Sequence, residues 1–201
     1  KTPVMVFINK MDRPARDPLE LVDEVEKELN IRVHPLTWPV GEGNGFKGIY
    51  NRLDRTFRSF NGTSKQTIGE FMEYRDIHDE TFISNMGPPG SRFLEDLELL
   101  QGVYGDPGPG GYVDGDEAPL FFGSALNNFG VKELLDFFLQ MAPSPGPVQT
   151  EKRMIDPFED RFAGFVFKIH ANMDPNHRDR IAFIKIASGR FERNKIYTHV
   201  R

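Results

Sequence analysis

Four residues near the start of the chain, Asn9-Lys10-Met11-Asp12, carry side chains suited to binding a purine base. They follow the apolar run 3–8, which predicts a buried strand that ends where the polar residues begin. An ionised carboxylate accepts hydrogen bonds from two adjacent donors, and guanine presents such a pair, N1–H and the exocyclic amino group. We therefore expect Asp12 to select guanine, Asn9 to contact the N7 side and the loop backbone, and the Lys10 stem to lie against the purine face. The alternative for this loop is a polar strand end without a ligand.

A second strand-end motif follows the apolar segment 119–122, where Gly123-Ser124-Ala125-Leu126 leads into a helical pattern. Backbone N–H groups of such a turn can reach the guanine O6. Open α/β sheets bind ligands at the carboxyl ends of their strands, so two strand-end loops that converge on one base are geometrically sensible. Taken alone, Ser124 and Ala125 would indicate only a turn of small residues.

The elements that position these loops follow from caps and periodicity. Asp17-Pro18 predicts the start of a helix over 18–29, and residues 31–40 predict an extended segment in which Trp38 packs in the core or at an edge. The glycine cluster 41–45 lacks the Lys-Ser/Thr and helix start of a phosphate-binding loop, so we do not assign it that role. The remaining expectations are a hairpin near Asn61-Gly62, a helix over 91–101, a mobile loop over 102–111, and a helix whose apolar face is Val131, Leu134, Leu135, Phe138 and Met141.

Charge is distributed unevenly along the 201 residues, whose formal net charge is −5. Residues 1–150 carry a net charge of −9 and residues 151–201 a net charge of +4, so the C-terminal piece is the part that we expect to face a polyanion. The absence of cysteine from the sequence excludes disulfides and thiolate metal sites. No apolar stretch approaches the length of a membrane span, and we expect a cytoplasmic protein.

A proline-rich segment, Ala142–Pro147, predicts a semi-rigid linker and a domain boundary. Beyond it, residues 162–169 and 180–189 predict two β-strands and residues 196–200 a third, which fits the opening of an antiparallel barrel. His170 and His177, with Asp174 and Asp179, fall in a turn without a recognised metal-ligand spacing, so we expect a solvated or salt-bridged loop there.

The pairing of Asn-Lys-Met-Asp with Gly-Ser-Ala-Leu resembles the base-recognition motifs of translational GTPases. Within that group the flanking sequence is similar to the bacterial peptide chain release factor 3 family, over essentially the whole chain and most closely over 1–18, 119–145 and 161–190. The similar stretches include Asn128-Phe129-Gly130-Val131, Gly164–Ile169, Ala171-Asn172-Met173-Asp174-Pro175 and His177-Arg178-Asp179-Arg180.

The resemblance implies an α/β fold: the C-terminal part of a P-loop-type GTP-binding domain over 1–145, with an insertion at about 46–118, followed by the first strands of an antiparallel β-barrel domain over 146–201. It implies GTP or GDP as the cofactor. The phosphate loop, the switch regions and the Mg²⁺ ligands of the family would precede Lys1, so we expect no catalytic residue, no metal ligand and no hydrolysis by 1–201 alone. The cofactor-binding residues implied are Asn9, Lys10, Met11, Asp12, Ser124, Ala125 and Leu126.

The resemblance also implies the partners. The parent protein would act on the ribosome, where its GTP cycle helps to remove the codon-reading release factors, without contact to a membrane or DNA. Basic residues of the second domain are candidate contacts to ribosomal RNA, the alternative being an ordinary solvated barrel surface. These residues are Arg153, Arg161, Lys168, Arg178, Arg180 and Lys185.

Two other interpretations stay open. An elongation factor G or a ribosomal-protection GTPase shares the base motifs, although we do not associate Asn172-Met173-Asp174-Pro175 with either. A non-catalytic ribosome-binding or scaffolding module would carry the Asn-Lys-Met-Asp loop as a vestige.

Overall fold

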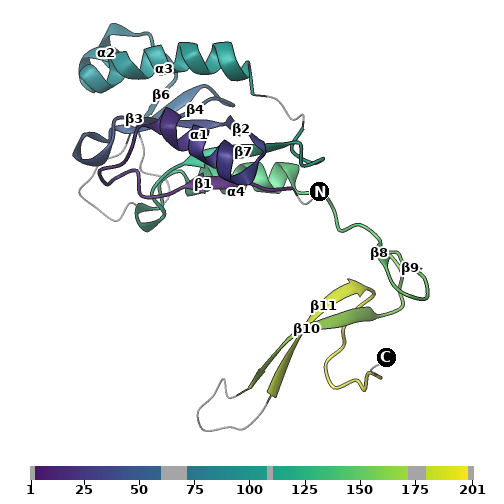
Figure 1. Cartoon of the computed structure of the whole chain (residues 1–201). Helices are drawn as coiled ribbons and strands as arrows, with labels where there is room; N and C mark the ends of the chain where they lie inside the picture. The colour runs from purple at the N-terminus through teal and green to yellow at the C-terminus, as the bar shows by residue number, and fades with distance from the viewer. Residues whose placement is uncertain (1–2, 60–71, 108–110, 172–179, 199–201) are drawn as a thin grey trace. The chain divides into compact units, whose positions relative to one another are not determined.

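The computed structural model describes residues 3–59, 72–107, 111–171 and 180–198, and the chain divides into two compact units, Lys1–Ala142 and Pro143–Arg201 (Figure 1). The hairpin expected near Asn61-Gly62 lies outside the described residues, as do His177, Asp174 and Asp179 of the rejected metal site.

A three-stranded parallel sheet forms the centre of the first unit. Its strands are β1 (Val6–Ile8), β7 (Glu117–Phe122) and β2 (Arg32–Pro35), in the order β1-β7-β2. All but the first residue of β7 are buried, as expected for a central parallel strand that is covered on both faces. Because β1 and β7 run parallel, with Ile8 opposite Phe122, the loops that follow them emerge side by side.

Helices cover the two faces of this sheet. α1 (Pro18–Leu29) begins where expected, with the Asp17 carboxylate accepting a hydrogen bond from the Leu19 N–H at 2.8 Å. Leu120 and Phe122 of β7 pack in one core cluster, which Val22 of α1 joins, whereas Phe121 packs in a second cluster under α4 (Val131–Met141).

The predicted apolar face of α4 was partly wrong. Leu134 and Met141 pack against the second cluster, but the side chain buried between them in sequence is Phe137, whereas Leu135 and Phe138 are about half exposed. Residues 134, 137 and 141 recur at helical spacing just as well as the predicted set, so periodicity alone did not distinguish the two stripes.

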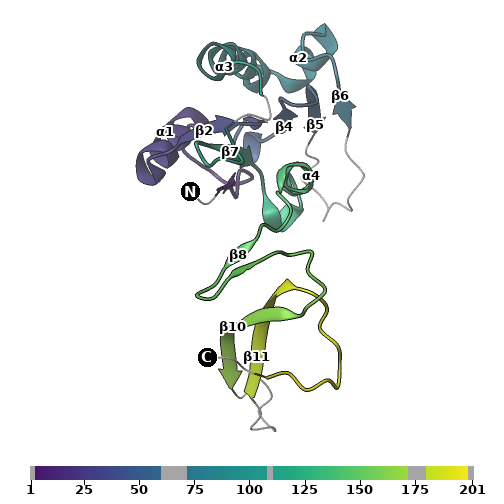
Figure 2. The same cartoon turned by 90° about the vertical axis from the view of Figure 1, so that its right-hand side faces the viewer.

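A four-stranded antiparallel sheet occupies the middle of the sequence: β3 (Thr37–Val40), β4 (Gly48–Asn51), β5 (Thr56–Ser59) and β6 (Glu73–Tyr74), with a 3₁₀ turn, η1 (Gly43–Gly45), between β3 and β4. α2 (Glu80–Met86) and α3 (Pro88–Tyr104) lie on the same side of this sheet in both views (Figure 1, Figure 2). Trp38 is fully buried and packs edge-on against Phe122, which joins this sheet to the parallel one and confirms its core position. α3 is longer than predicted at both ends, so residues 102–104 are helical rather than part of a loop.

His34 of β2 is a buried titratable group in the first unit. Its ring packs between Tyr104 and Tyr112, at centroid distances of 5.8 and 6.2 Å, and its Nε2 atom has no hydrogen-bond partner among the described residues. Burial, together with the neighbouring guanidinium groups of Arg52 and Arg32, lowers the pKa of His34 to about 4.

The second unit contains two antiparallel pairs: β8 (Val148–Gln149) with β9 (Met154–Ile155), and the longer β10 (Ala163–Ala171) with β11 (Arg180–Ser188). β10 and β11 confirm two of the predicted strands. The third strand, expected from Ile196, is not formed over the described residues 196–198, where no neighbouring strand pairs with the chain.

Candidate functional site

The two motif-bearing loops lie side by side and are joined by their backbones. The Gly123 N–H donates to the Ile8 carbonyl at 3.0 Å, and the Met11 N–H donates to the Gly123 carbonyl at 3.1 Å. These two bonds continue the pairing of β1 with β7 beyond the ends of the strands. The structure therefore brings Asn9–Asp12 and Ser124–Leu126 to one edge of the sheet, where a ligand site is expected in an open α/β fold.

The Asn9 side chain links the two loops. Its Oδ1 atom accepts a hydrogen bond from the Lys10 N–H at 2.8 Å and another from the Ala125 N–H at 2.9 Å. Both neighbours are backbone donors, so the oxygen of the amide must face them and the NH₂ group must face away. Asn9 thus fastens the loops with its acceptor and keeps a donor for a ligand.

Lys10, Met11 and Asp12 form a tight turn. Lys10 adopts a left-handed conformation with φ of 70°, and the Arg13 N–H donates to the Lys10 carbonyl at 3.0 Å. Met11 is only 1% exposed and packs in the main core, whereas Lys10 is exposed and Asp12 is partly exposed. The Met11 side chain anchors the loop to the core. The flanking side chains of Lys10 and Asp12 are the ones accessible to a ligand.

Ser124 is buried and stabilises the second loop through hydrogen bonds within it. It is 1% exposed, its N–H donates to the Phe129 carbonyl at 2.8 Å, and the Phe129 N–H donates back to its carbonyl at 2.9 Å. Its Oγ atom accepts from Asn127 Nδ2 at 3.1 Å. Ser124 therefore has a structural role in this geometry, and its N–H is committed within the loop rather than open to the guanine O6.

Ala125 and Leu126 begin the 3₁₀ turn η2 (Ala125–Asn127). The Ala125 N–H faces Asn9, but the first amides of a helical turn have no acceptor within the turn itself, which favours the Leu126 N–H as a donor to a ligand. The Leu126 side chain is 77% exposed. A residue with a side chain does not fit at position 123, because its Cβ atom would lie 2.2 Å from the Phe129 carbonyl oxygen and 2.7 Å from the Phe7 ring.

The glycine cluster 41–45 also reaches this site, which its sequence did not indicate. The Gly43 N–H donates to the Met11 carbonyl at 3.3 Å, so η1 contacts the first loop directly. The glycine content of 41–45 is the only signal for a backbone role in the sequence, and it does not indicate which segment these glycines approach.

A cavity of about 350 Å³ is lined by residues of η1 and of the starts of α1 and α3. Its lining includes Pro18, Pro39, Glu42, Phe93 and Asp96, and none of the seven expected nucleotide-binding residues. Among the described residues, no group of three or more His, Asp or Glu side chains could hold a metal ion. In the same residues, no helix combines the length and apolarity needed to cross a membrane.

Comparison with known protein families gives two matches. The model of the elongation factor Tu GTP-binding domain matches residues 1–144, and the model of elongation factor G domain 2 matches residues 161–201. The first match covers both strand-end loops and the whole of the α/β unit described above.

Proposed function

The chain belongs to the translational GTPases, with a GTP-binding domain of the elongation factor Tu type followed by a region of elongation factor G domain 2, and on that basis we propose that its strand-end loops recognise the guanine base of GTP and GDP. The observation that carries the proposal is the Asn9 side chain, which fastens both loops together and leaves an NH₂ group for the base.

Each polar group of the site has a partner on guanine. Asp12 accepts hydrogen bonds from N1–H and the exocyclic amino group, and Asn9 Nδ2 donates to N7. In this proposal the Leu126 N–H donates to O6, while the Lys10 stem covers the purine face. Adenine lacks the paired donors that Asp12 needs, so the same contacts would leave a carboxylate unpaired against it.

Base recognition is the part of the cycle that we assign to these residues. The sequence holds no Gly-x-x-x-x-Gly-Lys-Ser/Thr segment, so we place no phosphate contact, Mg²⁺ ligand or catalytic residue within 1–201. Mg²⁺ bound together with the nucleotide would neutralise charge that develops on the phosphates. Affinity from the base contacts alone is expected to be weak.

Within the family, we propose a ribosome-dependent GTPase of translation termination, similar to peptide chain release factor 3. The support is sequence resemblance, above all in Gly164–Ile169 and His177-Arg178-Asp179-Arg180. The match to elongation factor G domain 2 favours an elongation factor G-like GTPase as the second candidate. Recycling of codon-reading release factors by the complete gene product would support the first candidate, and translocation without recycling the second.

Ribosomal RNA is the partner that we propose for the basic second unit. Lys168 lies on β10, and Arg180 and Lys185 lie on β11, all in exposed positions. Arg153 is less suited to this role because its guanidinium forms an ion pair with Glu159 at 2.6 Å. Cations held near phosphates give affinity that falls with salt.

An Asp12→Asn variant tests the base assignment. The change replaces one acceptor oxygen with a donor that faces the donors of guanine, so GDP affinity should fall by at least about tenfold, the effect of about 1.4 kcal/mol. Xanthosine diphosphate has a carbonyl in place of the exocyclic amino group, and its affinity should rise in the variant. Calorimetry with GDP, xanthosine diphosphate and ADP on the unmodified chain and the variant measures both effects. Unchanged GDP affinity in the variant would refute the role of Asp12.

A further inference from the structure

We infer that the segment 41–58, which runs from η1 through β4 to β5, positions both base-recognition loops, with Gly43, Phe46 and Arg58 as positioning residues. The inference rests on the proposed function, which gives the two loops their role in base recognition. The positioning of the loops by this segment can nevertheless be measured without nucleotide. Three separate contacts lead from this segment to the two loops.

The first contact joins η1 to the loop after β1. The Gly43 N–H donates to the Met11 carbonyl at 3.3 Å. Gly43 has φ of +54°, and a Cβ atom there would lie 3.2 Å from the Pro14 nitrogen and 3.3 Å from its Cα. The η1 backbone therefore lies directly against the chain that follows Asp12, and glycine favours this close approach because it has no Cβ atom and adopts positive φ without strain.

The second contact joins the segment to the loop after β7. The Phe46 ring packs edge-on against the Phe129 ring, with centroids 5.4 Å apart and planes at 88°, and the two side chains are 5% and 2% exposed. Phe129 pairs with Ser124 through both of its backbone groups. Phe46 thus packs against the residue that closes the loop containing Ala125 and Leu126.

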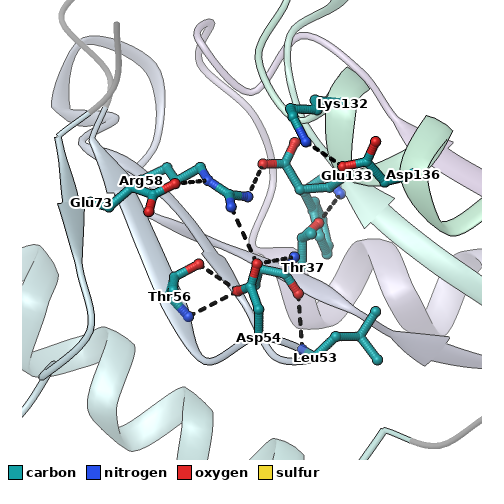
Figure 3. A network of polar contacts seen from close by, with 11 residues as sticks. Thr37, Leu53, Asp54, Thr56, Arg58, Glu73, Lys132, Glu133 and Asp136 are labelled. Carbon is teal, nitrogen blue, oxygen red and sulfur yellow. Dashed lines mark hydrogen bonds and ion pairs between the residues drawn. The ribbon is translucent and has the colours of Figure 1, made fainter. Parts of the chain in front are cut away.

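The third contact fixes the helix that follows this loop. Arg58 of β5 lies at the centre of a polar network, in which it donates to Glu133 of α4 at 2.5 Å, to Glu73 at 2.9 Å and to Asp54 at 3.2 Å (Figure 3). Burial acts to lower the pKa of Arg58, but the hydrogen bonds to Glu73 and Glu133 outweigh it and raise the pKa. The Arg58 guanidinium therefore stays protonated, and its hydrogen bond to Glu133 holds the first turn of α4 against the antiparallel sheet.

Gly130 shows how closely the same sheet approaches the helix start. It precedes α4 with φ of +76°, and a Cβ atom there would lie 2.4 Å from the Phe122 carbonyl oxygen and 3.0 Å from Cδ1 of Ile49 on β4. Phe129, Gly130 and Glu133 each lie against the segment 41–58. Their neighbours there are Phe46, Ile49 and Arg58, respectively. A shift of this segment would consequently move both loops.

A comparison of two glycines in one turn tests the inference. Gly43→Ala forces a side chain against Pro14, whereas a Cβ atom on Gly45 would meet nothing within 4 Å, so Gly45→Ala is the matched control. Gly87→Ala controls for the strained backbone, since Gly87 has φ of +63° and open space around it. Hydrogen exchange of the Met11 and Ala125 amides is measured on the 201-residue chain without nucleotide. We expect exchange at least about tenfold faster in Gly43→Ala and within about twofold of the unmodified chain in both controls.

The second readout is the affinity ratio of GDP to IDP, which lacks the exocyclic amino group and therefore reports on the Asp12 contact. A displaced Asp12 lowers this ratio toward one, whereas a general loss of stability leaves it unchanged. We expect a lower ratio in Gly43→Ala and an unchanged ratio in Gly45→Ala.

Phe46→Leu provides a second variant in case Gly43→Ala does not fold. Phe137→Leu is its control, because Phe137 is equally buried but its ring contacts are to Tyr112 and Phe121, neither of which lies in the segment 41–58. Faster exchange of the Ala125 amide in Phe46→Leu than in Phe137→Leu supports the inference. Equal exchange in each variant and its control would overturn it. Failure of the complete gene product to bind GDP would instead refute the proposed function, and the exchange data would still decide the positioning role.

Discussion

Replacing Asn9 is the most direct perturbation of the site, because one side chain fastens the two loops and, in the proposed function, also donates to the base. Asn9→Ala removes the oxygen that accepts the Lys10 and Ala125 N–H groups at 2.8 and 2.9 Å. Each such bond contributes about 0.5–1.5 kcal/mol, and the exposure of the site places both toward the lower end. Loss of the contact to N7 adds a similar amount, so we expect GDP affinity to fall by roughly 10- to 100-fold.

Asn9→Asp separates the two roles of the side chain. An aspartate keeps acceptor oxygens for the Lys10 and Ala125 N–H groups but has no donor for N7. The loops should therefore stay fastened while GDP affinity falls, since a carboxylate would face the N7 lone pair. Asn9→Ala should lose both properties.

Two measurements on the same samples check this prediction: hydrogen exchange of the Ala125 amide without ligand, and calorimetric titration with GDP. We expect faster exchange in Asn9→Ala only, and weaker GDP binding in both variants. Exchange of Ala125 that is equal in Asn9→Ala and the unmodified chain would show that Asn9 does not fasten the loops in solution. Full GDP affinity in Asn9→Asp would rule out the N7 contact.

Two further predictions concern the stability of the first unit. His34 has a pKa lowered to about 4 in the folded chain, so between about pH 6.5 and 4 the unfolded chain binds more protons and folding stability is lost as pH falls, by about 2 kcal/mol at pH 5. Urea unfolding at pH 7 and pH 5 should show this difference in the unmodified chain and in a variant of the exposed His78, but a much smaller one in His34→Phe. Gly123→Ala places a Cβ atom 2.2 Å from the Phe129 carbonyl oxygen and should lower the free energy of unfolding by about 1–3 kcal/mol, whereas Gly146→Ala, with no atom within 4 Å, should have little effect; equal effects would contradict the role of Gly123.

Local signals predicted the parts of the fold that local interactions determine. Asp17 followed by Pro18 fixes the start of α1, because the carboxylate caps the Leu19 N–H and proline suits the first helical position. The apolar runs before Asn9 and before Gly123 likewise predicted strands, and the parallel pairing of these strands brought the two loops together as expected. Burial was predicted correctly for β7, whereas β1 is only partly buried.

Features that depend on distant partners were harder to predict. The antiparallel sheet β3-β4-β5-β6 joins Thr37 to segments beyond residue 48, and nothing within each short strand specifies its neighbour. The α4 helix presents two overlapping apolar stripes, and only the position of the sheet decides that Phe137 is buried and Phe138 is not. The segment from Ile196 has strand propensity but pairs with no strand over its described residues.

The candidate site shows the same division between local and distant information. Residue types at the two strand ends predict groups that would face a base, because a carboxylate and an amide can match its donors and acceptors. They did not reveal that the Ser124 N–H is committed to Phe129, or that the Asn9 oxygen is committed to Ala125, because both facts depend on a partner in the folded chain. Gly43 is the clearest case: its contribution is a backbone N–H and the lack of a side chain, and neither carries a chemical signature in the sequence. Glycine clusters next to a recognised ligand loop should therefore be tested first as supports for that loop, since close backbone approach is the property that they share with phosphate-binding loops.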